Sequence, residues 1–163
     1  MATTVPPQPT NYRYDRAGKT YILTSIASSS YVPTRVEISA TSTLDITKHI
    51  VAINGFTTDR ETTVAPIAGS NGFPVLVDGA KTTEDCSIEI WADKLGVDVR
   101  SVVAIGDTIY PMFCPGGDIP TAYAAVWKCT VRSIGAPTDL SAVARVMLRL
   151  NPLDANERVV IPA

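Results

Sequence analysis

"AYAAVWKCTVRSI" (Ala122–Ile134) and "AVARVMLRL" (Ala142–Leu150) flank the turn-forming segment "GAPTDLS" near the end of the chain. Apolar residues alternate with other residues in both stretches, which predicts two β-strands joined as a long hairpin. One face of each strand is expected to point into a core: Ala125, Trp127, Cys129 and Val131 in the first strand, and Ala144, Val146, Leu148 and Leu150 in the second. The hairpin indicates antiparallel β structure.

Similar β-prone segments recur along the rest of the chain. They predict strands at Thr20–Ala27, Thr34–Ser39, His49–Asp59, Cys86–Ala92 and Thr108–Phe113. One helix is predicted over residues 93–106, "DKLGVDVRSVVAIG", because Leu95, Val99 and Val102 recur at helical spacing. The expected fold class is mainly β: an antiparallel β-sandwich or half-barrel with one flanking α-helix, a long inter-strand loop and extended terminal arms.

The composition is that of one globular domain, residues 1–163. Hydrophobic residues make up 45% and charged residues 18% of the chain, and no apolar run is long enough for a membrane-spanning helix. The net charge of −2 gives no bulk attraction to nucleic acid or to acidic membranes, so no membrane binding is expected. Residues 1–19 include three prolines and are predicted to form a flexible N-terminal arm. They show no secretory signal pattern, so the chain is expected to fold in a cytoplasm.

Residues suited to catalysis or metal binding are few. His49 is the only histidine, and the three cysteines, Cys86, Cys114 and Cys129, lack the C-x-x-C spacing of zinc and redox sites. They are expected to be free, mostly buried thiols. A thiol hydrolase that uses Cys114 or Cys129 with His49 is the enzyme alternative, but no supporting pattern surrounds these residues. The chain is therefore predicted to be no enzyme, with no catalytic residues, no cofactor and no metal.

Two apolar segments point to assembly. The segment Thr62–Thr83 is unusually long for a loop in a compact domain, and it carries apolar residues that a lone domain would leave partly in water. The C-terminal segment 156–163, "NERVVIPA", is also apolar and β-prone. The predicted inter-subunit contacts are Val64, Ile67, Phe73, Val75, Leu76, Val77, Val159, Val160 and Ile161. The alternative is that the loop folds back over its own domain and the tail is an ordinary last strand.

Four cations form a possible charged face on the polar side of the predicted hairpin: Lys128, Arg132, Arg145 and Arg149. Such a face could contact a phosphate backbone. The alternative is that Glu37, Glu89 or a neighbouring subunit pairs with these cations, since no aromatic residue is interleaved with them for base stacking.

The succession "TRVEISATSTLDITKHIVAINGFTTDRETT", "TTEDCSIEIWADKLGVDVRSVV", a late hairpin and a terminal "NERVVIPA" resembles the tail tube (major tail) proteins of long-tailed bacteriophages, particularly those of Gram-positive hosts. The resemblance extends from about residue 34 to residue 163. It implies a structural virion protein that is assembled in the host cytoplasm. Six copies would join edge to edge into a ring, and rings would stack into the tube through which the genome is delivered.

For this sequence the resemblance implies that 62–83 is an assembly loop that reaches an adjacent subunit or ring. The predicted helix at 93–105 would be an outer buttress, and the arms at both ends would join the contacts between rings. The four cations should lie outside the lumen or be paired. Implied partners are further copies of the chain, tape measure, terminator and baseplate components, and DNA passing transiently through the lumen. The alternative function is a monomeric β-sandwich binding or decoration module of a virion.

Overall fold

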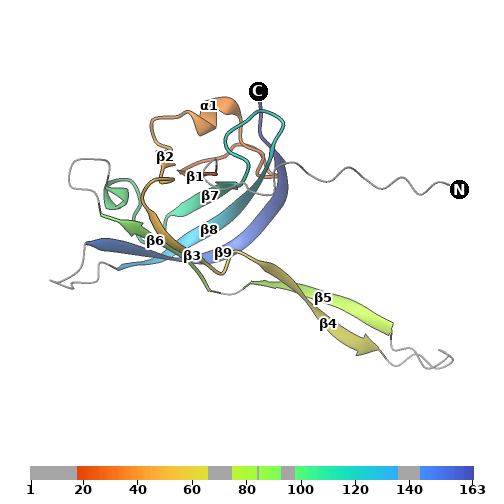
Figure 1. Cartoon of the computed structure of the whole chain (residues 1–163). Coiled ribbons are helices and arrows are strands. Elements are labelled where there is room, and N and C mark those ends of the chain that lie inside the picture. Colours follow the sequence, from red (N-terminus) through yellow and green to blue (C-terminus); the bar gives the residue numbers. More distant parts are fainter. Residues whose placement is uncertain (1–17, 66–74, 84, 93–97, 136–143) are drawn as a thin grey trace, which may run out of the picture. The chain divides into compact units, whose positions relative to one another are not determined.

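The computed structural model describes residues 18–65, 75–83, 85–92, 98–135 and 144–163 (Figure 1). These residues belong to two compact units. The first comprises 18–48, 109–128 and 154–163, and the second comprises the described parts of 49–108 and 129–153. Of the predicted N-terminal arm, 1–19, only the last two residues are described, and Lys19 already begins a strand; the remainder of the arm lies outside the described residues.

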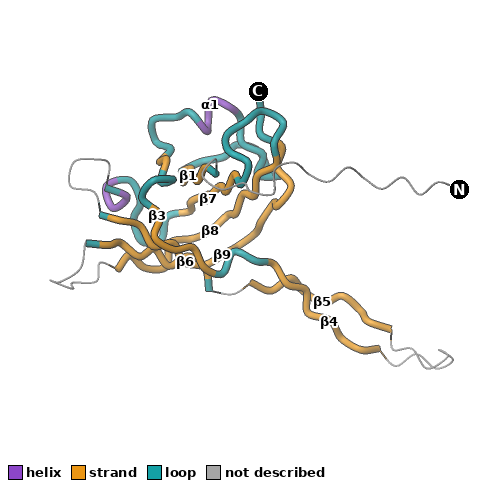
Figure 2. The backbone as a smooth tube through the Cα atoms, in the orientation of Figure 1, coloured by secondary structure: helices purple, strands orange, loops and turns teal. Residues whose placement is uncertain are grey.

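The fold class is confirmed as mainly β, with an antiparallel half-barrel sheet and one short α-helix, α1 (Arg35–Ile38). The sheet has seven strands in the order β2-β1-β7-β8-β9-β6-β3 (Figures 1 and 2). Their bounds are β1 Lys19–Leu23, β2 Leu44–Asp45, β3 Ile50–Asn54, β6 Cys86–Trp91, β7 Thr108–Cys114, β8 Tyr123–Gly135 and β9 Arg145–Val160. A separate two-stranded sheet consists of β4 (Thr58–Ala65) and β5 (Val75–Thr83).

The hairpin that decides the fold is present as β8 and β9. The residues of its expected inward face are buried on both strands, with two exceptions: Ala144 is exposed and Ala125 is only partly buried. Around Ala125 the buried residues are Ala124 and Val126 instead, and the phase of the alternation changes at Val126–Trp127, where two successive residues are buried. Because successive residues of a regular strand point to opposite faces, β8 is covered on both faces at this level.

The first unit has an apolar cluster built from strand residues distant in sequence. Tyr21 and Leu23 of β1 pack with Met112 and Cys114 of β7, and the other buried members are Ile38, Ala124, Val126, Val159 and Ile161. The antiparallel register of β1 and β7, in which Tyr21 faces Met112, brings the first four together. The end of β9 completes the cluster.

The strand predicted at Thr34–Ser39 is wrong, because this segment forms α1. Thr34 is the N-cap, and its side chain accepts a hydrogen bond from the backbone N–H of Glu37. The Glu37 carboxylate accepts the N–H of Thr34 in return, at 2.6 Å. This capping box satisfies donors that the first turn leaves free, and it outweighs the β propensity of Val36 and Ile38.

The helix predicted over residues 93–106 is also wrong in its described part. Residues 98–106 contain only a 3₁₀ turn, Val99–Ser101, with Asp98 as its N-cap; residues 93–97 lie outside the described residues. The backbone that follows bonds to β8: Gly106 N–H donates to the carbonyl of Val131, and Val131 N–H donates to that of Asp107. These bonds to a strand replace the i to i−4 bonds that a longer helix needs.

The long loop predicted at 62–83 is instead largely a ribbon of two antiparallel strands. In its register Thr63 faces Val77, Val64 faces Leu76 and Ala65 faces Val75. β-branched residues on both sides favour this pairing. Ile67 and Phe73, the other two apolar residues of the predicted contact set in this segment, lie outside the described residues.

Gly55 divides the predicted strand His49–Asp59 into β3 and β4. Its φ of +82° is a conformation that residues with a side chain rarely adopt. A Cβ atom at this position would lie 2.4 Å from the carbonyl oxygen of Asp85. The Cys86 thiol donates a hydrogen bond of 3.1 Å to the Gly55 carbonyl. The turn therefore requires glycine, both for its dihedral angle and for the close approach of the opposite strand.

Within the described part of the chain, no helix has the length and apolar character needed to cross a membrane.

We expect Gly55→Ala to destabilise the protein more than Gly106→Ala. Both glycines have positive φ, +82° and +93°, so alanine strains both, by about 1–3 kcal/mol each. Only at Gly55 would the new Cβ also collide with backbone, since nothing lies within 4 Å of a Cβ at Gly106. Urea unfolding of the two variants measures the difference. Equal losses would contradict the close approach of Asp85.

We expect Glu37→Gln to flatten the acid side of the stability profile. Backbone N–H groups of Thr34 and Ala27 bond the Glu37 carboxylate and lower its pKa. The unfolded chain therefore takes up this proton at a higher pH than the folded chain does. The stability that Glu37 contributes is complete above the ordinary pKa of about 4.3 and is lost as the pH falls through the lowered pKa. Glutamine keeps one acceptor oxygen, which can still accept the Thr34 N–H of the capping box. Urea midpoints between neutral and strongly acidic pH test this, and identical slopes would exclude the effect.

Candidate functional site

The predicted contact residues of the ribbon lie on both of its strands. Val64 is in β4, and Val75, Leu76 and Val77 are in β5. These two strands hydrogen-bond to each other and form a sheet of their own. The ribbon is thus joined through the chain to β3 and β6 without being part of their sheet.

The C-terminal segment belongs to the chain's own fold over most of its length. Val159 and Ile161 are buried in the apolar cluster of the first unit, whereas Val160 is 47% exposed. Backbone bonds of 2.9 Å join Ile161 to Ala122 and Thr121. The segment is therefore the end of a last strand, as the alternative interpretation expected, and Val160 is the one of its three predicted contact residues with surface to offer a partner.

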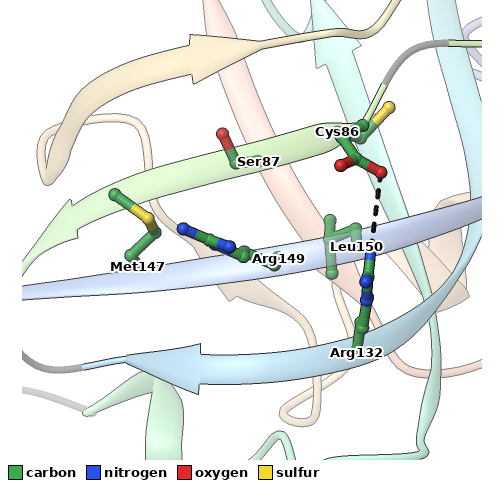
Figure 3. Close-up of a pocket in the computed structure, with 7 residues that line it drawn as sticks. Cys86, Ser87, Arg132, Met147, Arg149 and Leu150 are labelled. Carbon is green, nitrogen blue, oxygen red and sulfur yellow. Dashed lines mark ion pairs between the residues drawn. The ribbon is translucent and has the colours of Figure 1, made fainter.

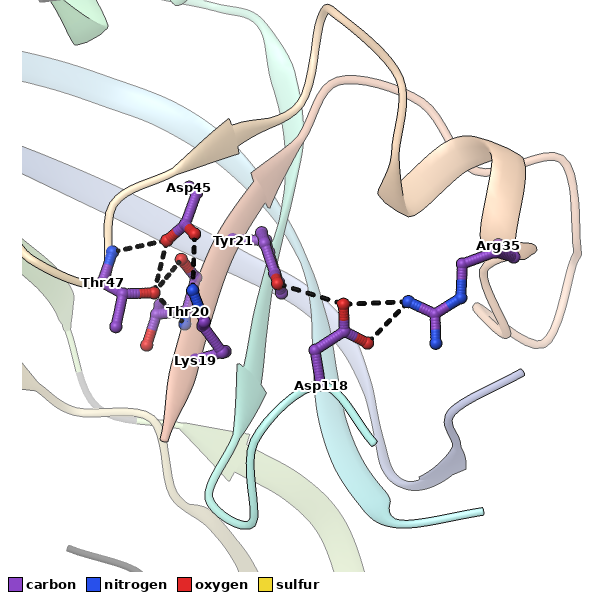
Figure 4. Close-up of polar contacts among 7 residues, drawn as sticks. All are labelled: Lys19, Thr20, Tyr21, Arg35, Asp45, Thr47 and Asp118. Atoms are coloured by element: carbon purple, nitrogen blue, oxygen red, sulfur yellow. Dashed lines mark hydrogen bonds and ion pairs between the residues drawn. The ribbon is translucent and has the colours of Figure 1, made fainter. Parts of the chain in front are cut away.

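A polar cluster holds the end of the chain in place. Arg35 of α1 donates to both carboxylate oxygens of Asp118, at 2.7 and 2.8 Å (Figure 4). It also donates to the carbonyl of Pro162, at 2.8 Å. The Tyr21 hydroxyl donates to Asp118 at 3.2 Å. Burial, together with the nearby Asp118 charge, raises the pKa of Tyr21 well above its usual value. The tyrosine is therefore a neutral donor, and the cluster is structural.

A second polar cluster fastens β2 to β1. Lys19 pairs with Asp45 at 3.0 Å, and Asp45 accepts the backbone N–H of Thr47 at 3.0 Å (Figure 4). The Thr47 hydroxyl also bonds to Asp45, and it accepts the backbone N–H of Thr20. These bonds secure the short outer strand, which has only two residues.

The three cysteines are free and buried, as predicted. Burial is the first cause that raises the pKa of Cys86 to about 11 and those of Cys114 and Cys129 to about 12. Such thiols stay protonated near neutral pH, and only the thiolate is a nucleophile or metal ligand. Among the residues that the structure describes, no group of three or more His, Cys, Asp or Glu side chains could hold a metal ion.

Two of the four predicted cations are engaged by aromatic or acidic neighbours. Arg145 pairs with Glu89 at 3.1 Å, and its guanidinium carbon lies 4.7 Å from the centre of the Trp91 ring. Lys128 lies 5.8 Å from the ring centre of Tyr31. Pairing by Glu89 is thus confirmed, whereas Glu37 is used in the capping box. The aromatic rings beside these two cations, those of Trp91 and Tyr31, come from neighbouring segments and not from the hairpin itself.

The other two cations line an open pocket of about 350 Å³ in the second unit (Figure 3). Arg132 of β8 reaches Asp85 at 3.5 Å, where both side chains are largely exposed. Arg149 of β9 faces Ser87 of β6 in the register, and among the described residues it has no hydrogen-bond or ion-pair partner. Met147 and Leu150 form apolar parts of the lining. The sequence placed both arginines on a polar face but gave no sign of a pocket.

The chemistry available in this pocket is recognition of an anion. Two guanidinium groups offer fixed, fork-shaped donors that match carboxylate and phosphate oxygens. Cys86 also lines the pocket, but its raised pKa keeps the thiol neutral. The described residues of the pocket therefore fit a binding surface better than a catalytic centre.

The sequence matches no known protein-family model and no curated protein. The structure is similar to a chain of the cryo-EM structure of the anti-feeding prophage (AFP) baseplate, 6-fold symmetrised, with 10% sequence identity, a TM-score of 0.54, and coverage of 92% of this chain and 95% of that one. It is also similar to a chain of the virion of a native gene transfer agent (GTA) particle, with 16% identity, a TM-score of 0.45, and coverage of 72% and 85%. The likeness to the baseplate chain establishes a shared fold.

We expect Arg145→Gln to destabilise the protein by about 1–3 kcal/mol, because it removes the ion partner of Glu89, whose side chain is only 18% exposed. The matched control is Arg149→Gln on the same strand, at an exposed position with no partner among the described residues. It should change stability by less than about 0.5 kcal/mol. Urea unfolding distinguishes the two, and equal effects would contradict the different roles of these arginines.

Proposed function

We propose that the chain is a structural subunit of a phage-type tail tube: copies join edge to edge into six-membered rings, and the rings stack into a conduit for the genome. The observation that carries this proposal is the exposed apolar edge strand β3, "IVAIN". Support comes from the sequence resemblance and from the shared fold with a chain of a six-fold baseplate. The site of action is the tail of a virion, after assembly in the host cytoplasm.

The edge strand β3 is poorly covered in the single chain. Among the residues that the structure describes, it pairs with β6 alone and is the last strand of the sheet. None of its residues is fully buried, and Ile53 is 38% exposed. An apolar edge with free backbone donors and acceptors promotes pairing with another chain unless something covers it. A neighbouring copy at this edge would satisfy the backbone groups and remove the apolar surface from water.

The opposite edge of the sheet also leaves room for a neighbour. Its outermost strand, β2, has two residues, Leu44 and Asp45, which face Ile22 and Tyr21 of β1. The remaining length of β1 has no strand on that side within the described part of the chain. A sheet with two such edges suits closure into a ring, because closure removes every free edge.

We assign the β4–β5 ribbon to contacts with an adjacent subunit or ring, with Val64, Val75, Leu76 and Val77 on its strands and Ile67 and Phe73 between them. Val160 is the exposed candidate at the C-terminal end. Tape measure, terminator and baseplate proteins would be further partners, and DNA would pass transiently through the lumen. The same proposal includes the expectation that Lys128, Arg132, Arg145 and Arg149 lie outside the lumen or are paired.

The second candidate function is a monomeric binding or decoration module of a virion. The anion-binding character of the Arg132 and Arg149 pocket is the observation that favours it. A decoration module would stay monomeric and bind its target through this pocket, whereas a tube subunit would associate with further copies of the chain through β3. The oligomeric state therefore separates the two functions.

We expect the purified wild-type chain to form rings or tubes in negative-stain electron microscopy, and Ile53→Lys to remain monomeric. A lysine on an edge strand keeps the fold but opposes edge pairing. The matched control is Ile105→Lys, at a loop position that is 66% exposed. It should assemble as the wild type does. A wild-type chain that stays monomeric at every concentration, or an Ile53→Lys variant that assembles normally, would contradict the proposal.

A further inference from the structure

The described residues leave two of the predicted cations without a close acidic or aromatic neighbour. Arg145 has Glu89 and Trp91, and Lys128 has Tyr31. Arg132 has only a long, solvent-exposed pair with Asp85, which is worth little because water screens it. Arg149 has no partner among these residues. The two weakly neutralised guanidinium groups line the same pocket (Figure 3).

The surroundings of the pocket favour a single carboxylate over a nucleic-acid backbone. Asp85 stands at its wall with a side chain that is 95% exposed, so an approaching polyanion would meet a negative charge beside the two positive ones. Met147 and Leu150 provide apolar contacts for methylene groups. An acidic side chain presents one small anion on a short apolar stem and fits both features.

We propose that this pocket binds a carboxylate from the β4–β5 ribbon of a second copy of the chain. The inference rests on the proposed function in that it requires self-assembly. It adds to the proposed function the two arginines that contact the neighbouring copy and the class of side chain, an acidic one, that they bind.

The ribbon is the part of the chain best suited to supply the carboxylate. Within the described part of the chain it forms a two-stranded sheet of its own. Its strands carry three acidic residues, Asp59, Glu61 and Asp78, and its two basic residues, Arg60 and Lys81, face each other in the register. The whole chain has 16 acidic and 14 basic residues, so a neighbouring copy brings a surplus of acid. Opposite charge on two parts of one chain favours a head-to-tail contact between copies.

Charge reversal on each side of the contact tests this inference. The combination Arg132→Glu with Arg149→Glu should raise the concentration needed for assembly by about tenfold or more, as loss of charge pairs across an interface does. The combination Asp59→Lys, Glu61→Lys and Asp78→Lys should do the same. Arg158→Glu, which reverses an exposed arginine elsewhere on β9, is the matched control and should assemble as the wild type does.

Joining both sets of substitutions in one chain exchanges the charges and should restore assembly to near the wild-type concentration. Light scattering across a concentration series measures each threshold, and circular dichroism verifies that every variant is folded. A five-substitution chain that assembles no better than its parents would overturn the inference, as would normal assembly of the two-arginine variant. Either of these results leaves the proposed function intact if the wild type forms rings. A wild type that never associates contradicts the inference and the proposed function together.

A titration with DNA tests the alternative explanation, that the pocket binds a phosphate backbone. The wild type and the Arg132→Glu, Arg149→Glu variant are titrated with a short labelled DNA duplex at low salt, and anisotropy is recorded. The inference predicts no difference between them in duplex binding. Loss of duplex binding in the variant, with assembly unchanged, would assign the pocket to phosphate and overturn the carboxylate proposal.

Discussion

Backbone hydrogen bonding along β8 and β9 is the constraint on which the rest of the structure depends. These are the two longest strands, and each contributes residues to both compact units. Val126 and Val159 belong to the core of the first unit, while Val131 and Leu148 are buried in the second. One hairpin thus contributes buried residues to the cores of both units.

An open sheet built on such a hairpin leaves edge strands, and their chemistry connects fold to function. β3 presents apolar side chains and backbone groups on a side where the described residues place no strand. Natural proteins usually protect such edges with charge, proline or short length. β2 follows this rule, since it has two residues and a charged end, but β3 does not. An edge left unprotected in this way is expected where another chain covers it.

The sequence predicted the long strands well and failed where local side-chain bonds decide the structure. β6, β7, β8 and the first part of β9 follow from alternation, although β7 and β8 each contain two successive buried residues. β9 continues to Val160, beyond the end predicted at Leu150. α1 was missed because Val36 and Ile38 favour a strand, whereas the bonds between Thr34 and Glu37 favour a helix turn. The helix predicted around Val99 failed because backbone bonds to β8 replaced helical ones. Periodicity carries no information about either kind of bond.

The candidate site was predicted only in part. The sequence placed Arg145 and Arg149 on one face, but their different environments depend on Glu89 and Trp91 of β6, a strand distant in sequence. The pocket likewise depends on the register between β6 and β9. The burial of Val159 and Ile161 could not be read from "NERVVIPA", because the same apolar pattern suits a partner's edge and the chain's own core.

The proposed function requires that β3 becomes an interior strand when the chain assembles. Hydrogen–deuterium exchange of residues 50–54, compared between the free chain and assembled material, tests this claim most directly, because a paired amide exchanges more slowly than a free one. The claim predicts strong protection of these amides on assembly, with little change in β8. Equal exchange of the β3 amides in both states would contradict it.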